Sequence, residues 1–408
     1  MTETRKQKLR KNERKIFWIS VLSGVGAINV VVTLFYLHRG LTLSQIFYLS
    51  IIYSIVTLLF EVPSSYMADR WGRKKTLLVG IVVLLLSWLV FLFAHSFLMF
   101  AVGTSFFAVY IACFSGTVEA LLYDSRLELG QTEGSVSSLG RFHSGKRLTK
   151  ILTPLLAAFL AKDLLEWQFQ SLIAIDLVSV SVALFLTTRL TEANHFMDVE
   201  QSEKGIFRDA WGIILNNKLL LRTILHKTLI FISSFIAWRF YQKFFIDMGT
   251  SILVLGISVS LSQFSTFLFL QKAQYFSNRF GLTKIINTIT FLFFLATFLF
   301  VIFMNISSQK FALLLLFFYQ VAFFLEVSRT PFFSEIYNKA SLSFNRSTTL
   351  SLVSLLKSIL DIPLLFLAAI MVKFDISFPF YITFILALIV VLFLRLPKEI
   401  DTMNGKTV

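Results

Sequence analysis

Apolar runs of about 20 residues recur along the whole chain, and they limit its possible folds more than any other feature of the sequence. Wound into a helix, each run is long enough to cross a bilayer core of roughly 30 Å. Hydrophobic residues make up 56% of the 408 residues and charged residues 15%, too few charges to cover a soluble protein of this size. The alternating pattern of a β-barrel is absent. The sequence therefore predicts an all-α membrane protein.

The apolar runs predict twelve transmembrane helices in two sets of six. Their approximate ranges are 16–38, 44–67, 75–94, 97–124, 142–161, 168–188, 222–247, 251–275, 282–304, 308–333, 347–371 and 376–394. The parts expected are a basic N-terminal tail (1–15), an N-terminal six-helix bundle (16–188), a central connection (189–221), a C-terminal six-helix bundle (222–394) and a C-terminal tail (395–408). In the central connection, IFRDAWGIILNN has the spacing of a short amphipathic helix on the membrane surface, either a tether or a regulatory element.

Lys and Arg are concentrated in alternate connections. The N-terminal tail holds seven, the connection after the second span four, and the stretch from Arg189 to Lys227 six, whereas the intervening connections hold about one each. This distribution predicts that both termini and the central connection are cytoplasmic, and it attributes the net charge of +15 to membrane orientation rather than to nucleic-acid binding. We expect a multi-pass protein of the cell (plasma) membrane.

A charged cluster, SYMADRWGRKKTLL at 65–78, interrupts the apolar pattern between the second and third spans, and QYFSNRFGLTKII at 274–286 repeats it. The aligned pairs, all at an offset of 209, are Asp69 with Asn278, Arg70 with Arg279, Gly72 with Gly281, and Lys75 with Lys284. The repeat falls in the corresponding connection of the second half. Two six-helix halves related by pseudo-symmetry are therefore expected, an arrangement that in transporters places the substrate between the halves near the bilayer midplane.

The stretch DRWGRKKTL resembles the signature between helices 2 and 3 of the major facilitator superfamily (MFS). The matching residues are Asp69, Arg70, Gly72, Arg73, Lys74 and Leu77, with Ser65 in place of the leading glycine. The resemblance implies the twelve-helix MFS fold and transport by alternating access. For the substrate it implies almost nothing, because the fold serves many.

The resemblance also implies a role for the cluster as a gate. Asp69 would lie at the start of helix 11, around Ser347 to Thr349, and Arg73 would pair with Asp124 at the inner end of helix 4. Independently, a helix N-terminus favours a carboxylate and Gly72 permits a tight turn. Lys74 would belong to the gate or, alternatively, only anchor the chain at the membrane surface.

Ionisable and strongly polar residues inside the spans are costly there and are candidates for proton coupling or substrate binding. They are Glu119, Glu326, Lys357, Asp361, Arg239 and Gln242. Lys357 and Asp361 are four residues apart and share a helix face. Burial favours the neutral form of a carboxylate, which suits it to carry a proton. The alternative is that these groups form fixed ion pairs, such as Glu326 with Lys357, and a structural pairing is also expected for Asp176.

The leading hypothesis is a secondary active transporter that exports a hydrophobic or amphipathic small molecule in exchange for protons. EVPSSYMADRWGRK, GTVEALLYDS and NRSTTLSLVSLLKS resemble bacterial efflux transporters, although TKILTPLLAA lacks the glycines of the drug-antiporter signature in helix 5. Nutrient uptake and a transporter-like ligand sensor are the alternatives.

The expected partners are the lipid bilayer, a small-molecule substrate and protons, with no nucleic acid, and the chain is expected to be a monomer. No enzyme activity, metal or cofactor is expected, because scattered histidines and one cysteine give no ligand spacing. A proton gradient would supply the energy.

Overall fold

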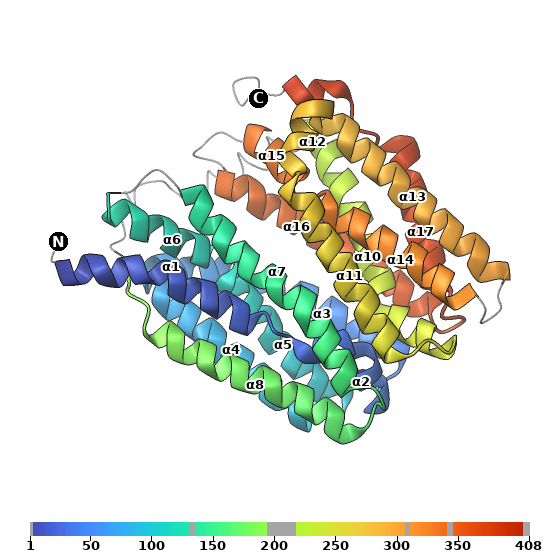
Figure 1. Cartoon of the computed structure of the whole chain (residues 1–408), viewed down its shortest axis with the longest axis horizontal. Helices are drawn as coiled ribbons and strands as arrows, with labels where there is room; N and C mark the ends of the chain where they lie inside the picture. Colours follow the sequence, from blue (N-terminus) through green and yellow to red (C-terminus); the bar gives the residue numbers. More distant parts are fainter. Residues whose placement is uncertain (1–2, 131–134, 194–217, 307–310, 341–345, 403–408) are drawn as a thin grey trace. The chain divides into compact units, whose positions relative to one another are not determined.

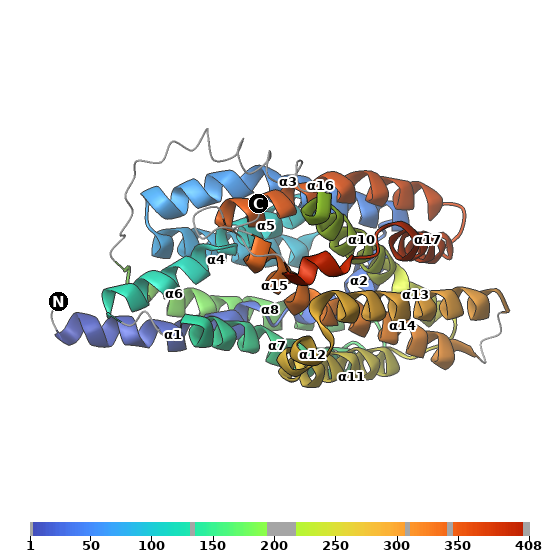
Figure 2. The same ribbon diagram turned by 90° about the horizontal axis from the view of Figure 1, so that it is seen from above.

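The computed structural model describes residues 3–130, 135–193, 218–306, 311–340 and 346–402, and within these ranges it is helical without strands. Side chains are described there except at 62, 135–147, 338–340, 346–355 and 401–402. The chain divides into two compact units, Met1–Val199 and Glu200–Val408. Each is a bundle of long helices (Figures 1 and 2). The amphipathic helix predicted in IFRDAWGIILNN lies outside the described residues.

The helices of each unit follow one another without long irregular segments. In unit 1 they are α1 (Glu3–Ser23), η1 (Ala27–Val30), α2 (Val32–His38), α3 (Leu43–Arg70), α4 (Arg73–Phe93), α5 (Phe97–Phe114), α6 (Thr117–Glu128), α7 (Ser135–Leu160) and α8 (Glu166–Thr188). In unit 2 they are α10 (Lys218–Asp247), α11 (Ile252–Gln271), α12 (Ala273–Phe280), α13 (Leu282–Ile306), α14 (Ala312–Ser328), α15 (Thr330–Ala340), α16 (Arg346–Met371), α17 (Phe378–Phe393) and η3 (Lys398–Thr402).

All twelve predicted spans coincide with helices, and the protein is an all-α membrane protein of two six-helix bundles. Eight helical stretches of the described chain are long and apolar enough to cross a membrane, and shorter apolar helices at Leu148–Leu160 and Phe378–Phe393 add to them. The fifth and twelfth spans correspond to these shorter helices. The first and eleventh spans are in neither set, and the helix of the first span is interrupted.

The interruption of the first span has a specific cause. The chain leaves the helix after Ser23, and Gly26 adopts the left-handed conformation (φ 50°) that glycine tolerates best. Asp176 on α8 is 1% exposed, and its two carboxylate oxygens accept hydrogen bonds from the backbone N–H groups of Ala27 (2.7 Å) and Ile28 (3.1 Å). Asp176 thus satisfies backbone donors that the break would leave unpaired, a structural role as expected for it.

Two further spans are interrupted at matching places in the two units. The fourth span breaks between α5 and α6 at Gly116, where φ is 72°, and the tenth breaks between α14 and α15 at Arg329. The sequence did not predict these breaks. Each divides a helix into a longer, mostly apolar part and a shorter segment that carries charged side chains.

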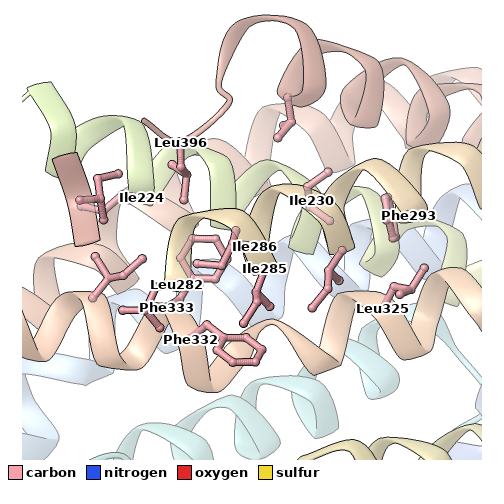
Figure 3. Close-up of a cluster of buried hydrophobic side chains, with 14 of the residues drawn as sticks. Ile224, Ile230, Leu282, Ile285, Ile286, Phe293, Leu325, Phe332, Phe333 and Leu396 are labelled. Atoms are coloured by element: carbon pink, nitrogen blue, oxygen red, sulfur yellow. The ribbon is translucent and has the colours of Figure 1, made fainter. Parts of the chain in front are cut away.

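A large apolar cluster packs near the α12–α13 turn of unit 2. Figure 3 shows side chains of α10, α13, α14 and α15 that meet in one buried cluster with Leu396. Its labelled members are Ile224, Ile230, Leu282, Ile285, Ile286, Phe293, Leu325, Phe332, Phe333 and Leu396. This cluster occupies the place that, in unit 1, holds the charged residues of the motif.

Candidate functional site

The motif forms the tight turn between α3 and α4. Gly72 adopts φ 102° and ψ 147°, a conformation essentially restricted to glycine. A Cβ at this position would lie 3.0 Å from Oε2 of Glu192. Gly72 is therefore required both by the backbone and by the close approach of that carboxylate.

Arg73 and Asp124 form the ion pair that the resemblance implied. The Nη1 atom of Arg73, at the first turn of α4, contacts Oδ2 of Asp124 on α6. Their side chains are only 9% and 8% exposed. A buried pair of this kind is costly to separate by removing one partner, because the other charge would stay desolvated.

The other charged motif residues lie at or near the surface of unit 1. Asp69 and Arg70 are exposed in the last turn of α3, and Arg70 stacks over the ring of Tyr66, 5.6 Å from its centroid. Lys74 is half-buried. The side chains of residues 347–349, the expected neighbours of Asp69, lie outside those described, so the contact of Asp69 with helix 11 stays a prediction.

Glu192 is a motif partner that sequence reasoning missed. It follows α8, and its carboxylate oxygens accept hydrogen bonds from the backbone N–H groups of Arg73 (3.0 Å) and Lys74 (2.9 Å). A carboxylate there satisfies two free donors and interacts favourably with the helix dipole. The only signal in the sequence was an acidic residue shortly after the sixth span, a signal too weak to specify a partner.

The N-terminal segment is also part of this site. It was predicted as a basic tail, yet it forms the first turns of α1 and packs on α6 and α8 (Figure 1). Arg5 binds Glu128 through two hydrogen bonds (2.5 and 3.0 Å), and Arg126 donates to Glu13 (2.7 Å). The side chain of Asn12 donates to Thr191 O (2.8 Å) and accepts from Thr191 N (3.0 Å).

In unit 2 the repeat preserves the turn but not its ion pair. Gly281 adopts φ 82° and ψ 151°, close to Gly72. Arg279 donates to the hydroxyl of Tyr275 (2.6 Å), Lys284 lies over the ring of Phe280, and Asn278 accepts from Gln274 (2.9 Å). These contacts are local to α12 and its turn.

The clearest charged pair within the spans is Lys357 with Asp361 on α16. Their Nζ and Oδ2 atoms are 3.4 Å apart, with side chains 37% and 4% exposed, so the prediction of a shared face is confirmed. Within the described part of the chain, Oδ1 of Asp361 accepts no hydrogen bond. The ammonium of Lys357 also lies 4.3 Å from the ring centroid of Phe231 on α10.

Glu326 and Glu119 are placed differently from each other. Glu326, at the end of α14, is half-buried and lies close enough to Lys227 and Arg329 to interact with them electrostatically. Glu119 is exposed on unit 1 in the first turn of α6, just after Gly116. A carboxylate in the first turn is favoured by the helix dipole.

Arg239 and Gln242 share α10 but not their surroundings. Arg239 is half-buried and lies over the rings of Phe235 (4.9 Å) and Trp238 (5.0 Å). Gln242 is 1% exposed inside unit 2.

Sequence reasoning also did not predict the polar cluster at the α14–α15 break. Arg329 is 1% exposed, donates to the hydroxyl of Thr290 (3.3 Å) and lies over the ring of Phe333. His226 on α10 contacts the same hydroxyl through Nε2 (2.9 Å) and Leu394 O through Nδ1 (2.8 Å). A lone histidine in an apolar run gives no sign that it will join three helices.

Comparison with known proteins identifies the family. The profile described as Major Facilitator Superfamily matches residues 16–360, so the chain belongs to the major facilitator superfamily of transporters. A comparison with curated protein sequences finds no match.

Solved structures share the fold at low sequence identity. A mutant of the nucleoside transporter NupG superposes with a TM-score of 0.75 at 13% identity, covering 94% of this chain and 98% of the other. A D-xylose–proton symporter gives 0.73 at 12% identity, with 96% and 98% coverage. A bacterial homologue of the iron transporter ferroportin, in the inward-facing state, gives 0.73 at 15% identity, with 97% and 98% coverage.

Proposed function

We propose that this transporter works by alternating access and exports a hydrophobic or amphipathic small molecule in exchange for protons, across the plasma membrane with both termini cytoplasmic. The observation that carries proton coupling is the pair of Lys357 and Asp361. Asp361 is buried, one of its oxygens accepts no hydrogen bond in the described chain, and its counter-charge Lys357 is partly exposed.

The chemistry of this pair suits a proton carrier. A buried carboxylate with one ammonium partner is balanced between two stable forms: ionised beside the cation, or neutral and free of it. A proton on Asp361 removes the attraction that holds Lys357. Lys357 can then move or bind an anionic group, so protonation is converted into a change in the site.

The gate in this proposal is the motif. Arg73 and Asp124 join the inner ends of α4 and α6 by an ion pair that can separate, and Gly72 and Glu192 hold the turn that presents Asp69. Asp69 would meet the start of helix 11 when the transporter is closed to the cytoplasm. That contact would break on inward opening.

Aromatic walls within unit 2 support an apolar substrate. A small cavity of about 20 Å³ lies among α10, α13, α14 and α17. Its lining includes Phe293, Phe300, Phe318, Phe323 and Phe380, with Tyr319 beside them. Helices with such faces would present an apolar surface to the substrate wherever they line the transport path.

Uptake is the second candidate, because one protein of the same fold is a D-xylose–proton symporter and others carry nucleosides. A ligand sensor without transport is the alternative of another class. Measured flux separates transport from sensing, and the direction of the pH gradient that drives accumulation separates export from uptake.

The test is transport of lipophilic dyes and antibiotics into sealed proteoliposomes with and without an imposed pH gradient. Wild type is compared with Asp361→Asn and with Glu119→Gln, a matched loss of one intramembrane carboxylate in the other unit. We expect gradient-driven flux to fall at least about tenfold in Asp361→Asn, while gradient-independent exchange persists. Flux that ignores both the gradient and Asp361 would refute proton coupling through this pair. Ligand binding without any flux would favour the sensor.

A further inference from the structure

A cluster of basic side chains gathers where α1, α4 and α8 meet at the motif end of unit 1. Lys8, Lys11 and Lys15 follow one another at helical spacing on one face of α1. The ammonium of Lys15 donates to the backbone carbonyl of Arg189, the residue that ends α8. α1 and α8 lie side by side in Figure 1.

A backbone hydrogen bond places Lys74 near the end of α8. Its N–H donates to Glu192 (2.9 Å), three residues beyond Arg189. The carboxylate of Glu192 is itself occupied by the two N–H groups at the start of α4. Nearby acids are engaged elsewhere too, since Glu13 binds Arg126 and Glu128 binds Arg5.

Burial and neighbouring positive charge both act on the Lys15 ammonium. Partial burial lowers the pKa of the Lys15 ammonium from its ordinary value. Repulsion lowers it further, and the cations responsible are Lys74, Lys11, Arg189 and Lys8. Positive charge is thus concentrated at a partly desolvated point, where an anion would be favoured.

Exposed aromatic rings lie beside the cluster. Trp18, three residues beyond Lys15 on the same side of α1, is 46% exposed. Phe185, one turn before Arg189 on α8, is 56% exposed, and the guanidinium of Arg189 lies 5.0 Å from its ring centroid. Tryptophan rings at the ends of transmembrane helices lie at the level of lipid headgroups.

We propose that Lys8, Lys11, Lys15, Lys74 and Arg189 form a binding site for the headgroup of an anionic phospholipid, whose acyl chains lie along Trp18 and Phe185. The phosphate would bind between Lys15 and Arg189, and Lys8, Lys11 and Lys74 would surround it. A lipid fits better than a soluble anion because the aromatic rings extend the site into the bilayer. The proposal is independent of the transported substrate.

Tryptophan quenching by brominated lipid tests the site. The full-length protein is placed in phosphatidylcholine vesicles that contain a minor fraction of brominated phosphatidylglycerol or of brominated phosphatidylcholine. The signal of Trp18 is the difference between each protein and its Trp18→Phe version. We expect the anionic lipid to be enriched at Trp18 by about tenfold over the zwitterionic lipid.

The chain offers a matched control on the same helix. Lys8→Gln with Lys11→Gln and Lys15→Gln should reduce the enrichment to near one, whereas Lys6→Gln with Arg10→Gln and Arg14→Gln, three basic residues on another face, should leave it unchanged. Equal losses in both triple variants would show general attraction to a charged membrane and overturn the site. Retained enrichment in the first triple variant would overturn it as well.

One further variant and one competitor complete the test. If the first triple variant does not fold, Arg189→Gln keeps the carbonyl that Lys15 uses and should alone lower the enrichment several-fold. Inorganic phosphate is added to wild type as a competitor. Complete loss of enrichment at millimolar phosphate would assign the site to a soluble anion and overturn the lipid.

Discussion

The repeat contains two similar turns, α3–α4 in unit 1 and α12–α13 in unit 2. Their backbone conformations are nearly the same, but the buried side chains at corresponding positions are charged in unit 1 and apolar in unit 2. Gly72 and Gly281 adopt similar positive φ values. The next residue is Arg73 in unit 1 and Leu282 in unit 2, and both are buried. At the same offset of 209, Asp124 corresponds to Phe333, which belongs with Leu282 to one apolar cluster (Figure 3).

The difference shows which unit can change its contacts at this place. An ion pair recovers much of its energy when water enters, because both charges are hydrated again. An apolar contact recovers nothing on exposure. We therefore infer that the turn of unit 1 carries a separable contact, while that of unit 2 is a permanent part of its core.

The largest effect is expected from Arg73→Leu alone. This change leaves Asp124 buried without its partner and should destabilise the protein by about 3–5 kcal/mol. Thermal and denaturant unfolding of the purified protein in detergent measure the loss. A loss below about 1 kcal/mol would show that the pair is well hydrated and would remove the contrast between the units.

The matched variant gives unit 1 the residues of unit 2. Arg73→Leu combined with Asp124→Phe should restore stability to near the wild-type value, because an apolar pair can replace a buried ion pair. Transport per folded molecule should still fall at least about tenfold, since the contact would no longer separate. Full transport by this double variant would contradict a gating role for the ion pair.

A smaller effect is expected from Leu282→Ala in unit 2. Removal of buried side-chain volume from the cluster should cost about 2–4 kcal/mol of stability. Transport per folded molecule should stay within about twofold of wild type, because this contact does not open. Unfolding and proteoliposome flux of the same preparation separate the two effects, and a selective loss of flux would place the turn of unit 2 in the gate.

The next effects in size are expected from Gly72→Ala and Gly281→Ala. Alanine at either position would be held at a positive φ that L-residues avoid, at about 1–3 kcal/mol. Gly72→Ala should cost more than Gly281→Ala, because the new Cβ would press on Glu192. The excess should vanish when Glu192→Ala is added, a double-mutant cycle read by thermal unfolding. An unchanged excess would show that Glu192 is not its cause.

The sequence could predict what depends on periodicity and local spacing. Apolar runs predicted every span, because a membrane accepts only long apolar helices. The four-residue spacing of Lys357 and Asp361 predicted their shared face. The pairing of Arg73 with Asp124 came from the family resemblance, since no local pattern connects residues that far apart in the chain.

Other features depend on tertiary contacts that leave no local pattern. The break at Gly26 depends on Asp176 of α8, which lies 149 residues beyond Ala27 in the chain. The helical N-terminal segment is stabilised by pairs such as Arg5 with Glu128, and an isolated basic segment would not predict them. Glu192 was missed because its bonds are to backbone atoms, which carry no sequence signal.

The smallest changes in stability are expected from Glu192→Gln and Asp69→Asn. Glu192→Gln removes the negative charge at the start of α4 and should cost about 1 kcal/mol of stability, with little change in flux per folded molecule. Asp69→Asn changes an exposed side chain, so stability should hold within about 0.5 kcal/mol while flux falls. Unfolding measurements should therefore show a loss of stability for Glu192→Gln, and flux measurements should show a loss of transport for Asp69→Asn. If both lose only stability, Asp69 belongs to the structure of unit 1, and the gate must lie elsewhere.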